Sequence, residues 1–231
     1  MTVDPRATQK RQAGEAAAAL VTDGMVVGLG TGSTAFFAIA QLIERARDGL
    51  HITCVPTSER SAAQARDGGL TLVELTQALQ IDLTIDGADA VAAGSLDLIK
   101  GLGGALLREK IVAAASRRLV IVADDSKLVD RLGGGSVPIP VEVVTFGWQA
   151  TAARLYTLGV RPVLRQQSGG TPFQTDGRNL ILDCYTDVLD DPALLDAEIR
   201  AVVGVVETGL FLGMASEVYA AAASGVRRVL R

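Results

Sequence analysis

The sequence contains few of the residues that build metal centres and disulfide frameworks. Its 231 residues include two cysteines and one histidine. Cys54 and Cys184 lie in separate apolar runs, with no Cys-x-x-Cys spacing and no histidine beside them. Structural zinc sites need four clustered Cys or His ligands, so we expect no metal site and two reduced, buried thiols.

The sequence also lacks an excess of positive charge and any long apolar run. Lys and Arg number 22 against 26 Asp and Glu, a net charge of −4, and basic residues cluster only in short runs such as Arg227-Arg228. Nucleic-acid binding needs a basic face, so we expect no nucleic acid partner, whereas a small anion in a local pocket is compatible with this charge. The first eleven residues have no signal-peptide core, and runs such as 119–123 are far too short to span a membrane. We therefore expect a cytoplasmic protein with no membrane partner.

The sequence is rich in apolar strands that alternate with helices. Hydrophobic residues make up 48% of the chain, which is enough for a sizeable core in one large or two small domains. Strands are predicted at 25–29, 51–56, 70–74, 79–85 and 119–123, and helices at 7–22, 35–46, about 57–66 and about 105–116. The hydroxyl and acidic residues of Thr57-Ser58-Glu59-Arg60-Ser61 are expected to cap the start of the helix at about 57–66. This order predicts a Rossmann-like parallel sheet, which binds ligands beyond the carboxyl ends of its strands.

A second set of elements follows a glycine-rich segment after residue 132. Strands at 141–145, 161–166, 179–185 and 205–211, with helices at 147–158 and 192–202, form two βαβ halves of a ferredoxin-like unit. A helix at 215–223 and a strand at 226–230 are then expected to rejoin the first domain. We predict an α/β protein with a Rossmann-like domain of residues 1–131 plus 212–231 and an inserted ferredoxin-like α+β domain of residues 132–211.

A glycine-rich turn connects the first predicted strand to the following helix. In Gly28-Leu-Gly-Thr-Gly-Ser-Thr-Ala, the backbone N–H groups and the positive helix end suit an anion, and Thr31, Ser33 and Thr34 add hydroxyl groups. Ser33 stands where a dinucleotide fingerprint needs its third glycine, and no Gly-Lys-Ser/Thr of a P-loop follows. A mononucleotide or sugar-phosphate site remains, alongside a turn that serves only close strand-to-helix packing.

Two carboxylates and two small residues follow the strand predicted at 79–85. Asp86 and Asp89 flank Gly87-Ala88, and two carboxylates this close are expected to titrate as a coupled pair, with one pKa raised. Such a pair keeps both an acid and a base near neutral pH. An Asp-Gly turn that caps a helix and an Asp-x-x-Asp magnesium site are the alternatives.

A lysine and a further carboxylate complete this stretch. Lys100 precedes Gly101-Leu-Gly-Gly104, where an ammonium group and backbone N–H groups would suit an oxyanion or enediolate. A Schiff-base lysine and a surface lysine are the alternatives. Glu109, within Arg108-Glu-Lys110, is either a general base for a C–H proton or part of a solvated helix face.

Taken together, these residues resemble the ribose-5-phosphate isomerase type A family over nearly the whole chain. Each short motif is weak alone, but their ordered set is highly specific. The matching segments are Gly30-Thr-Gly-Ser-Thr34, Thr57-Ser58, Asp86-Gly-Ala-Asp89, Lys100-Gly with Gly103, Arg108-Glu-Lys110, Ser126-Lys127, Pro140-Val-Glu-Val143, Arg161-Pro162, Thr175-Asp176, Ile181-Leu-Asp183 and 205–211.

The resemblance implies interconversion of D-ribose 5-phosphate and D-ribulose 5-phosphate through a cis-enediolate, in the non-oxidative branch of the pentose phosphate pathway. It implies no cofactor and a homodimer or homotetramer. Glu109 would move the proton between C1 and C2, Lys100 would stabilise the oxyanion, and Asp89 would assist ring opening. Asp86 would hydrogen-bond the sugar hydroxyls and assist proton movement. The other expected substrate-binding residues are Thr31, Gly32, Ser33, Thr34, Gly87, Ala88, Gly101, Leu102, Gly103 and Lys127.

Some positions depart from the family's pattern. Leu102 and Ala90 stand where the family usually has glycine and glutamate, and the spacer from Asp89 to Lys100 is a residue longer than expected. If position 102 required φ > 0, leucine would strain it or reshape the loop. Two competing hypotheses are a non-catalytic sugar-phosphate sensor of the same fold and an amino-sugar-phosphate deaminase or lactonase. The complete set of acidic groups and lysine argues against the sensor, and the position of His51 argues against the deaminase.

Overall fold

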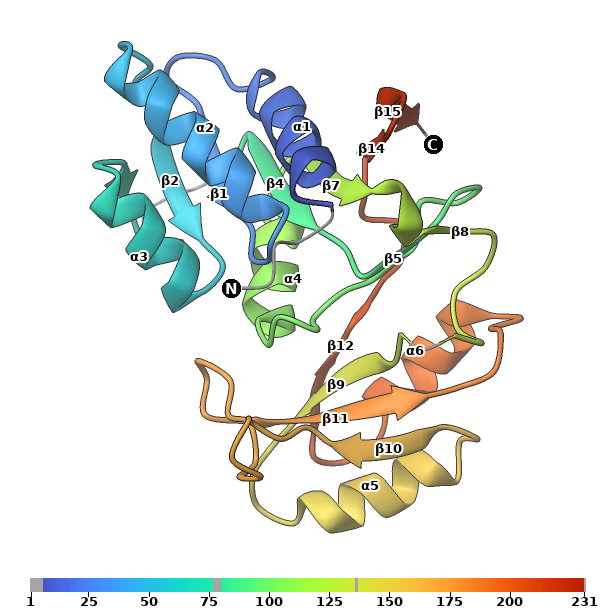
Figure 1. The fold of residues 1–231 in the computed structure, drawn as a ribbon. Coiled ribbons are helices and arrows are strands. Elements are labelled where there is room, and N and C mark those ends of the chain that lie inside the picture. The colour runs from blue at the N-terminus through green and yellow to red at the C-terminus, as the bar shows by residue number, and fades with distance from the viewer. Residues whose placement is uncertain (1–5, 77–79, 136, 231) are drawn as a thin grey trace.

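The computed structural model describes residues 6–76, 80–135 and 137–230 and is built on a seven-stranded sheet (Figure 1). The strand order is β15-β14-β7-β4-β1-β2-β3; β15 is antiparallel to β14, and the other neighbouring pairs are parallel. β1 and β4 are neighbours although β2 and β3 lie between them in the chain, so their carboxyl ends form the switch point where such sheets bind ligands. The strands are β1 (Val26–Leu29), β2 (Thr53–Pro56), β3 (Thr71–Leu72), β4 (Leu83–Gly87), β7 (Leu119–Asp124), β14 (Glu217–Ala222) and β15 (Gly225–Leu230).

Helices cover both faces of this sheet, which confirms the Rossmann-like prediction. The helices are α1 (Ala7–Ala18), α2 (Ala35–Arg47), α3 (Glu59–Asp67) and α4 (Leu106–Ala114). In β7, Val120 and Val122 pack with α1 and α2, whereas Leu119 and Ile121 pack in a second cluster with α4. β4 alternates in the same way: Leu83 and Ile85 join the first cluster, so the next residue, Asp86, faces α4.

Residues 139–208 form a second sheet with two helices, below the first sheet in Figure 1, which we call the antiparallel unit. Its strand order, β10-β11-β9-β12, is the ferredoxin-like arrangement expected from the sequence. The predicted domain limits of 132 and 211 stay a prediction. The elements are β9 (Ile139–Val143), α5 (Trp148–Tyr156), β10 (Arg161–Leu164), β11 (Leu180–Tyr185), α6 (Pro192–Arg200) and β12 (Val205–Thr208).

A small third sheet lies where the chain passes between these two parts. Its order is β13-β6-β5-β8, with β5 (Ala90–Ala92), β6 (Leu98–Ile99), β8 (Leu128–Val129) after the 3-10 turn Asp125–Lys127, and β13 (Leu210–Phe211). The chain leaves β12 through Gly209, whose carbonyl accepts the Lys100 N–H at 2.9 Å. This sheet therefore fixes the backbone of Lys100, which directly follows β6.

The predicted helix at 215–223 was wrong, because this segment is strand β14. The four consecutive alanines at 220–223 have high helix propensity. In the structure, however, Ala221 is buried in the cluster with α1, and Val218 and Ala220 are buried on the other face of the sheet with Leu119 and Ile121 of β7. Tertiary burial therefore outweighed local propensity. The short strands β5, β6 and β8 were not predicted, and residue 79, the predicted start of β4, lies outside the described residues. Within the described parts of the chain, no helix is both long enough and apolar enough to cross a bilayer.

Candidate active site

The glycine-rich turn lies between β1 and α2, beside the end of β4. Gly30 must be glycine because a Cβ there would lie 2.2 Å from Asp86 Oδ1. Behind the turn, the Thr31 hydroxyl donates to Ser58 Oγ at 2.7 Å and lies 2.7 Å from Thr57 Oγ1, while Ser61 Oγ donates to the Gly30 carbonyl at 2.6 Å. Ser58 also caps α3, as its hydroxyl-rich start predicted. These buried hydroxyls hold the turn from behind.

Asp86 joins this turn to the lysine. Its side chain is fully buried, and its Oδ1 accepts the Thr31 N–H at 2.9 Å and the Gly87 N–H at 2.7 Å. Its Oδ2 lies 2.8 Å from Lys100 Nζ. Both carboxylate oxygens are therefore engaged by protein groups, so Asp86 links the backbone of the turn to the ammonium group.

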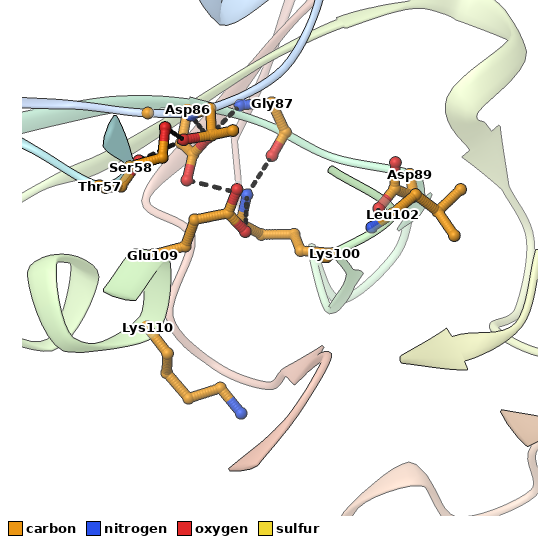
Figure 2. Close-up of polar contacts among 12 residues, drawn as sticks. Thr57, Ser58, Asp86, Gly87, Asp89, Lys100, Leu102, Glu109 and Lys110 are labelled. Atoms are coloured by element: carbon orange, nitrogen blue, oxygen red, sulfur yellow. Dashed lines mark hydrogen bonds and ion pairs between the residues drawn. The ribbon is translucent and has the colours of Figure 1, made fainter. Parts of the chain in front are cut away.

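Figure 2 shows Lys100 Nζ between Asp86, the Gly87 carbonyl and Glu109. Nζ donates to the Gly87 carbonyl at 2.6 Å and lies 3.3 Å from Glu109 Oε2. Lys100 and Glu109 are each 2% exposed, which excludes the surface-lysine and solvated-helix interpretations. Beyond the ion pairs with Lys100, neither Asp86 Oδ2 nor Glu109 Oε2 has a hydrogen-bond partner in the described part of the chain.

The next residue of α4 anchors this helix. Lys110 points away from the cluster (Figure 2), lies 2.9 Å from Glu207 Oε1 and donates to the Thr208 carbonyl at 2.7 Å. The centre of the Phe211 ring lies close to both ammonium groups, 5.3 Å from Lys100 Nζ and 4.9 Å from Lys110 Nζ. The strand segment 207–211 therefore holds both α4 and Lys100, and with them Glu109.

Burial and charge shift the pKa values of this cluster in ways that suit acid–base chemistry. Burial raises the pKa of Glu109 to about 8. The positive charge of Lys100 lowers this pKa only in part, and the negative charges of Asp86 and Asp89 raise it further. Burial likewise raises the pKa of Asp86. Burial alone would lower the pKa of Lys100, but the adjoining Asp86 and Glu109 outweigh it and hold this pKa above its ordinary value. One ammonium group thus faces two carboxyl groups, one of which takes up a proton near neutral pH.

Asp89 and the loop after Lys100 form another part of the site. The Leu102 N–H donates to Asp89 Oδ2 at 2.9 Å, and the two side chains lie together in Figure 2. The positive φ angles in this loop belong to Gly101 (+107°) and Gly104 (+85°). Among the described residues, the non-glycine positions with positive φ are Leu96 and Arg178. Leu102 is therefore accommodated without the strain that a left-handed position would impose, and its side chain is 41% exposed.

These groups line one cavity of about 110 Å³. All the predicted site residues line this cavity except Asp86 and Leu102. Asp86 is buried beneath the lining residues, and Leu102 belongs to the loop after Lys100. Lys10 of α1 also lines it, which sequence analysis missed because nothing in an amphipathic helix marks that lysine. A larger cavity of about 700 Å³ beside α5 has Arg154 as its one ionisable lining residue. The lining residues of the smaller cavity are Lys10, Thr31, Gly32, Ser33, Thr34, Gly87, Ala88, Asp89, Lys100, Gly101, Gly103, Glu109 and Lys127.

Comparison with known proteins identifies the family. The family model described as ribose 5-phosphate isomerase A (phosphoriboisomerase A) matches residues 53–225. A ribose-5-phosphate isomerase A from Gloeobacter violaceus is 57% identical over 217 residues, 94% of each chain, and one from Thermomicrobium roseum is 51% identical over 222 residues, 96% of this chain and 93% of the relative. The chain belongs to the ribose 5-phosphate isomerase A family.

Solved structures of the ribose 5-phosphate isomerase A family share the whole fold. One from Methanocaldococcus jannaschii has a TM-score of 0.93 and 36% identity, covering 98% of this chain and 100% of that one. A D-ribose-5-phosphate isomerase in complex with phospho-erythronic acid has a TM-score of 0.93 and 34% identity, covering 97% and 98%. The family resemblance seen in the motifs is thus confirmed over the full fold, and the sensor hypothesis is not favoured.

Proposed function

We propose that this chain interconverts D-ribose 5-phosphate and D-ribulose 5-phosphate through an enediolate, with Glu109 as the general base. Membership of the ribose 5-phosphate isomerase A family makes the chain an isomerase, and one observation carries the residue assignment. Buried Glu109 lines the cavity with its carboxylate 3.3 Å from the ammonium of Lys100. A base and a charged donor side by side are what a proton shift next to a carbonyl requires.

The proposed reaction follows from these two groups. Glu109 takes the C2 proton of the open-chain aldose, and negative charge then develops on the C1 oxygen. Lys100 stabilises this charge, and a proton then passes from the C2 hydroxyl to the C1 oxygen. As the C2 oxygen becomes the ketone, the proton held by Glu109 is delivered to C1. A base whose pKa lies near the working pH is efficient in both directions, which the raised pKa of Glu109 provides.

Asp86 and Asp89 support this reaction in different ways. In this geometry Asp86 acts through Lys100, whose charge it maintains at 2.8 Å, and its direct contact with sugar hydroxyls stays a prediction. Asp89 lines the cavity, and one of its oxygens holds the Leu102 N–H, so its other oxygen is the candidate for assisting ring opening. The mechanism uses the chain's own ionisable groups and invokes no metal or organic cofactor.

The phosphate is proposed to bind at the opposite end of the cavity from the reacting carbons. Thr31 lines this end, but its N–H and hydroxyl already bond to Asp86 and Ser58. Residues 32–34 offer backbone N–H groups and the Ser33 and Thr34 hydroxyls next to the start of α2, and Lys10 and Lys127 add positive charge to the same cavity. Because this end is built from residues separate from Lys100 and Glu109, phosphate binding and proton transfer are separable by mutation.

We also propose a cytoplasmic location and a homo-oligomer, a dimer or a tetramer, which the family resemblance implied. Size-exclusion chromatography with light scattering would measure the mass of the assembly. A monomer at micromolar concentration would contradict the oligomer.

Direct detection of D-ribulose 5-phosphate from D-ribose 5-phosphate tests the proposed function. We expect turnover by the purified wild-type chain. Saturable binding of the sugar phosphate without turnover would instead support the sensor, and release of ammonia from an amino-sugar phosphate would support the deaminase.

A further inference from the structure

The loop of residues 100–104, which we call the sugar-facing loop, is held from two sides. Asp89 accepts the Leu102 N–H from the cavity side. From the other side, Arg165 of the antiparallel unit reaches across with Nη1, which donates to the Gly101 carbonyl at 2.8 Å and to the Leu102 carbonyl at 3.1 Å. The two peptide groups around Leu102 are thus fixed by one residue from each part of the molecule.

Arg165 is itself rigidly placed. Its Nε donates to Asp183 Oδ2 at 2.9 Å and its Nη2 to Asp183 Oδ1, a two-pronged ion pair in which the two side chains are only 12% and 15% exposed. Its guanidinium carbon lies 5.9 Å from the centre of the Phe173 ring. Its backbone N–H donates to the Ile181 carbonyl and its carbonyl accepts the Phe173 N–H, both at 2.9 Å. These contacts hold both the backbone and the side chain of Arg165 in place.

This geometry matters because the sugar-facing loop carries cavity-lining groups. Lys100 begins the loop, and Gly101 and Gly103 line the cavity. Gly101 and Gly104 both have positive φ, and the Gly104 N–H donates to the Gly101 carbonyl at 3.0 Å, so the loop is a tight glycine turn. Arg165 supplies the contacts that tie this turn to the antiparallel unit. Only a planar guanidinium has enough fixed donors to bind a carboxylate with two prongs and two carbonyls at once, so a lysine cannot replace it.

We propose that Arg165 is a positioning residue for the isomerisation, which fixes the sugar-facing loop in the geometry needed for turnover. The expected effect on turnover rests on the proposed function. The expected effect on the loop rests on the hydrogen bonds described above. Phosphate binding should not depend on Arg165, because residues 31–34 belong to a different loop.

The test compares Arg165→Met and Arg165→Lys with wild type and with Arg161→Met as the matched control. Arg161 begins β10, the strand that ends immediately before Arg165, and its exposed guanidinium stacks on the Tyr185 ring at 4.5 Å instead of contacting the sugar-facing loop. Both Arg165 variants should lower kcat/KM by about 10-fold to 10²-fold, the usual effect of a misplaced site, while the inhibition constant of inorganic phosphate stays unchanged. Arg161→Met should match wild type. Full activity of Arg165→Lys would overturn the proposal, since charge alone would then suffice.

Hydrogen exchange of the peptide spanning residues 100–106 gives a readout that is independent of activity. Exchange should be faster in both Arg165 variants than in wild type and in Arg161→Met, and unchanged exchange would overturn the proposal. If Arg165→Met fails to fold, Asp183→Asn keeps the arginine but weakens its anchor and should shift exchange and kcat/KM in the same direction by a smaller factor. Absence of turnover in wild type would refute the proposed function, while the exchange comparison would still decide the role of Arg165.

Discussion

Replacing Glu109 with glutamine should stabilise the protein, and more so at alkaline pH. The folded state raises the pKa of this carboxyl from its ordinary 4.5 to about 8, because the group is buried. The folded state therefore holds the proton more tightly than the unfolded state. The contribution of Glu109 to stability is full below pH 4.5 and is lost as the pH rises towards 8. Glutamine is uncharged at every pH and removes this loss.

The size of the effect follows from the two pKa values. Each pH unit between them lowers the free energy of unfolding by about 1.4 kcal/mol, so the loss is about 1 kcal/mol at about pH 5.5 and about 4–5 kcal/mol at about pH 8.5. The advantage of Glu109→Gln over wild type should thus grow by about 3 kcal/mol between these conditions. At about 2–4 °C per kcal/mol for a chain of this size, the difference in Tm should widen by about 6–12 °C.

Calorimetry of both proteins at the two pH values measures this difference. Glu44→Gln on α2 is the control, because Glu44 is exposed and the loss of its charge should change the Tm difference little between the two conditions. An advantage of Glu109→Gln that is the same at both pH values would refute the reasoning, since the carboxyl would then not be held protonated by its burial.

The wild-type kcat/KM should fall about tenfold per pH unit below about pH 8, because Glu109 must be ionised to accept the C2 proton; a pH–rate profile that is flat down to about pH 6 would contradict this. Changing Ser33 and Thr34 together to alanine should raise KM about tenfold or more and leave kcat within about twofold, because phosphate contacts are shared by ground and transition states; initial rates decide, and an unchanged KM would move the phosphate elsewhere. Leu102→Gly should leave kcat/KM within about twofold in the same assay, since this exposed side chain is not at a positive φ; a large gain would show that leucine distorts the loop.

The sequence was most informative where one local pattern decides the structure. The glycine turn after β1, the Ser58 cap of α3 and the carboxylates after β4 were all predicted, because strand ends and helix starts have characteristic residues. The order of strands and helices was sufficient for both the Rossmann-like and the ferredoxin-like arrangements.

The sequence was least informative where distant segments meet. Strand β14 was predicted as a helix because its run of alanines favours a helix locally, whereas its burial depends on distant elements such as β7 and α1. Lys10 reaches the cavity from α1, and Arg165 reaches the sugar-facing loop from the antiparallel unit. No periodicity or spacing encodes such contacts, since they depend on how the two sheets are placed. The same limit applies to Glu109, whose Arg-Glu-Lys context is typical of a solvated helix face although the side chain is buried.

The most direct test of Glu109 as the base is the rate of conversion of D-ribose 5-phosphate by Glu109→Gln, relative to wild type, in excess EDTA at about pH 8.5. We predict that wild type turns over in EDTA and that kcat of the variant is lower by about 10² to 10⁴, with sugar-phosphate binding retained. A variant that keeps full activity would show that another group moves the proton between C1 and C2.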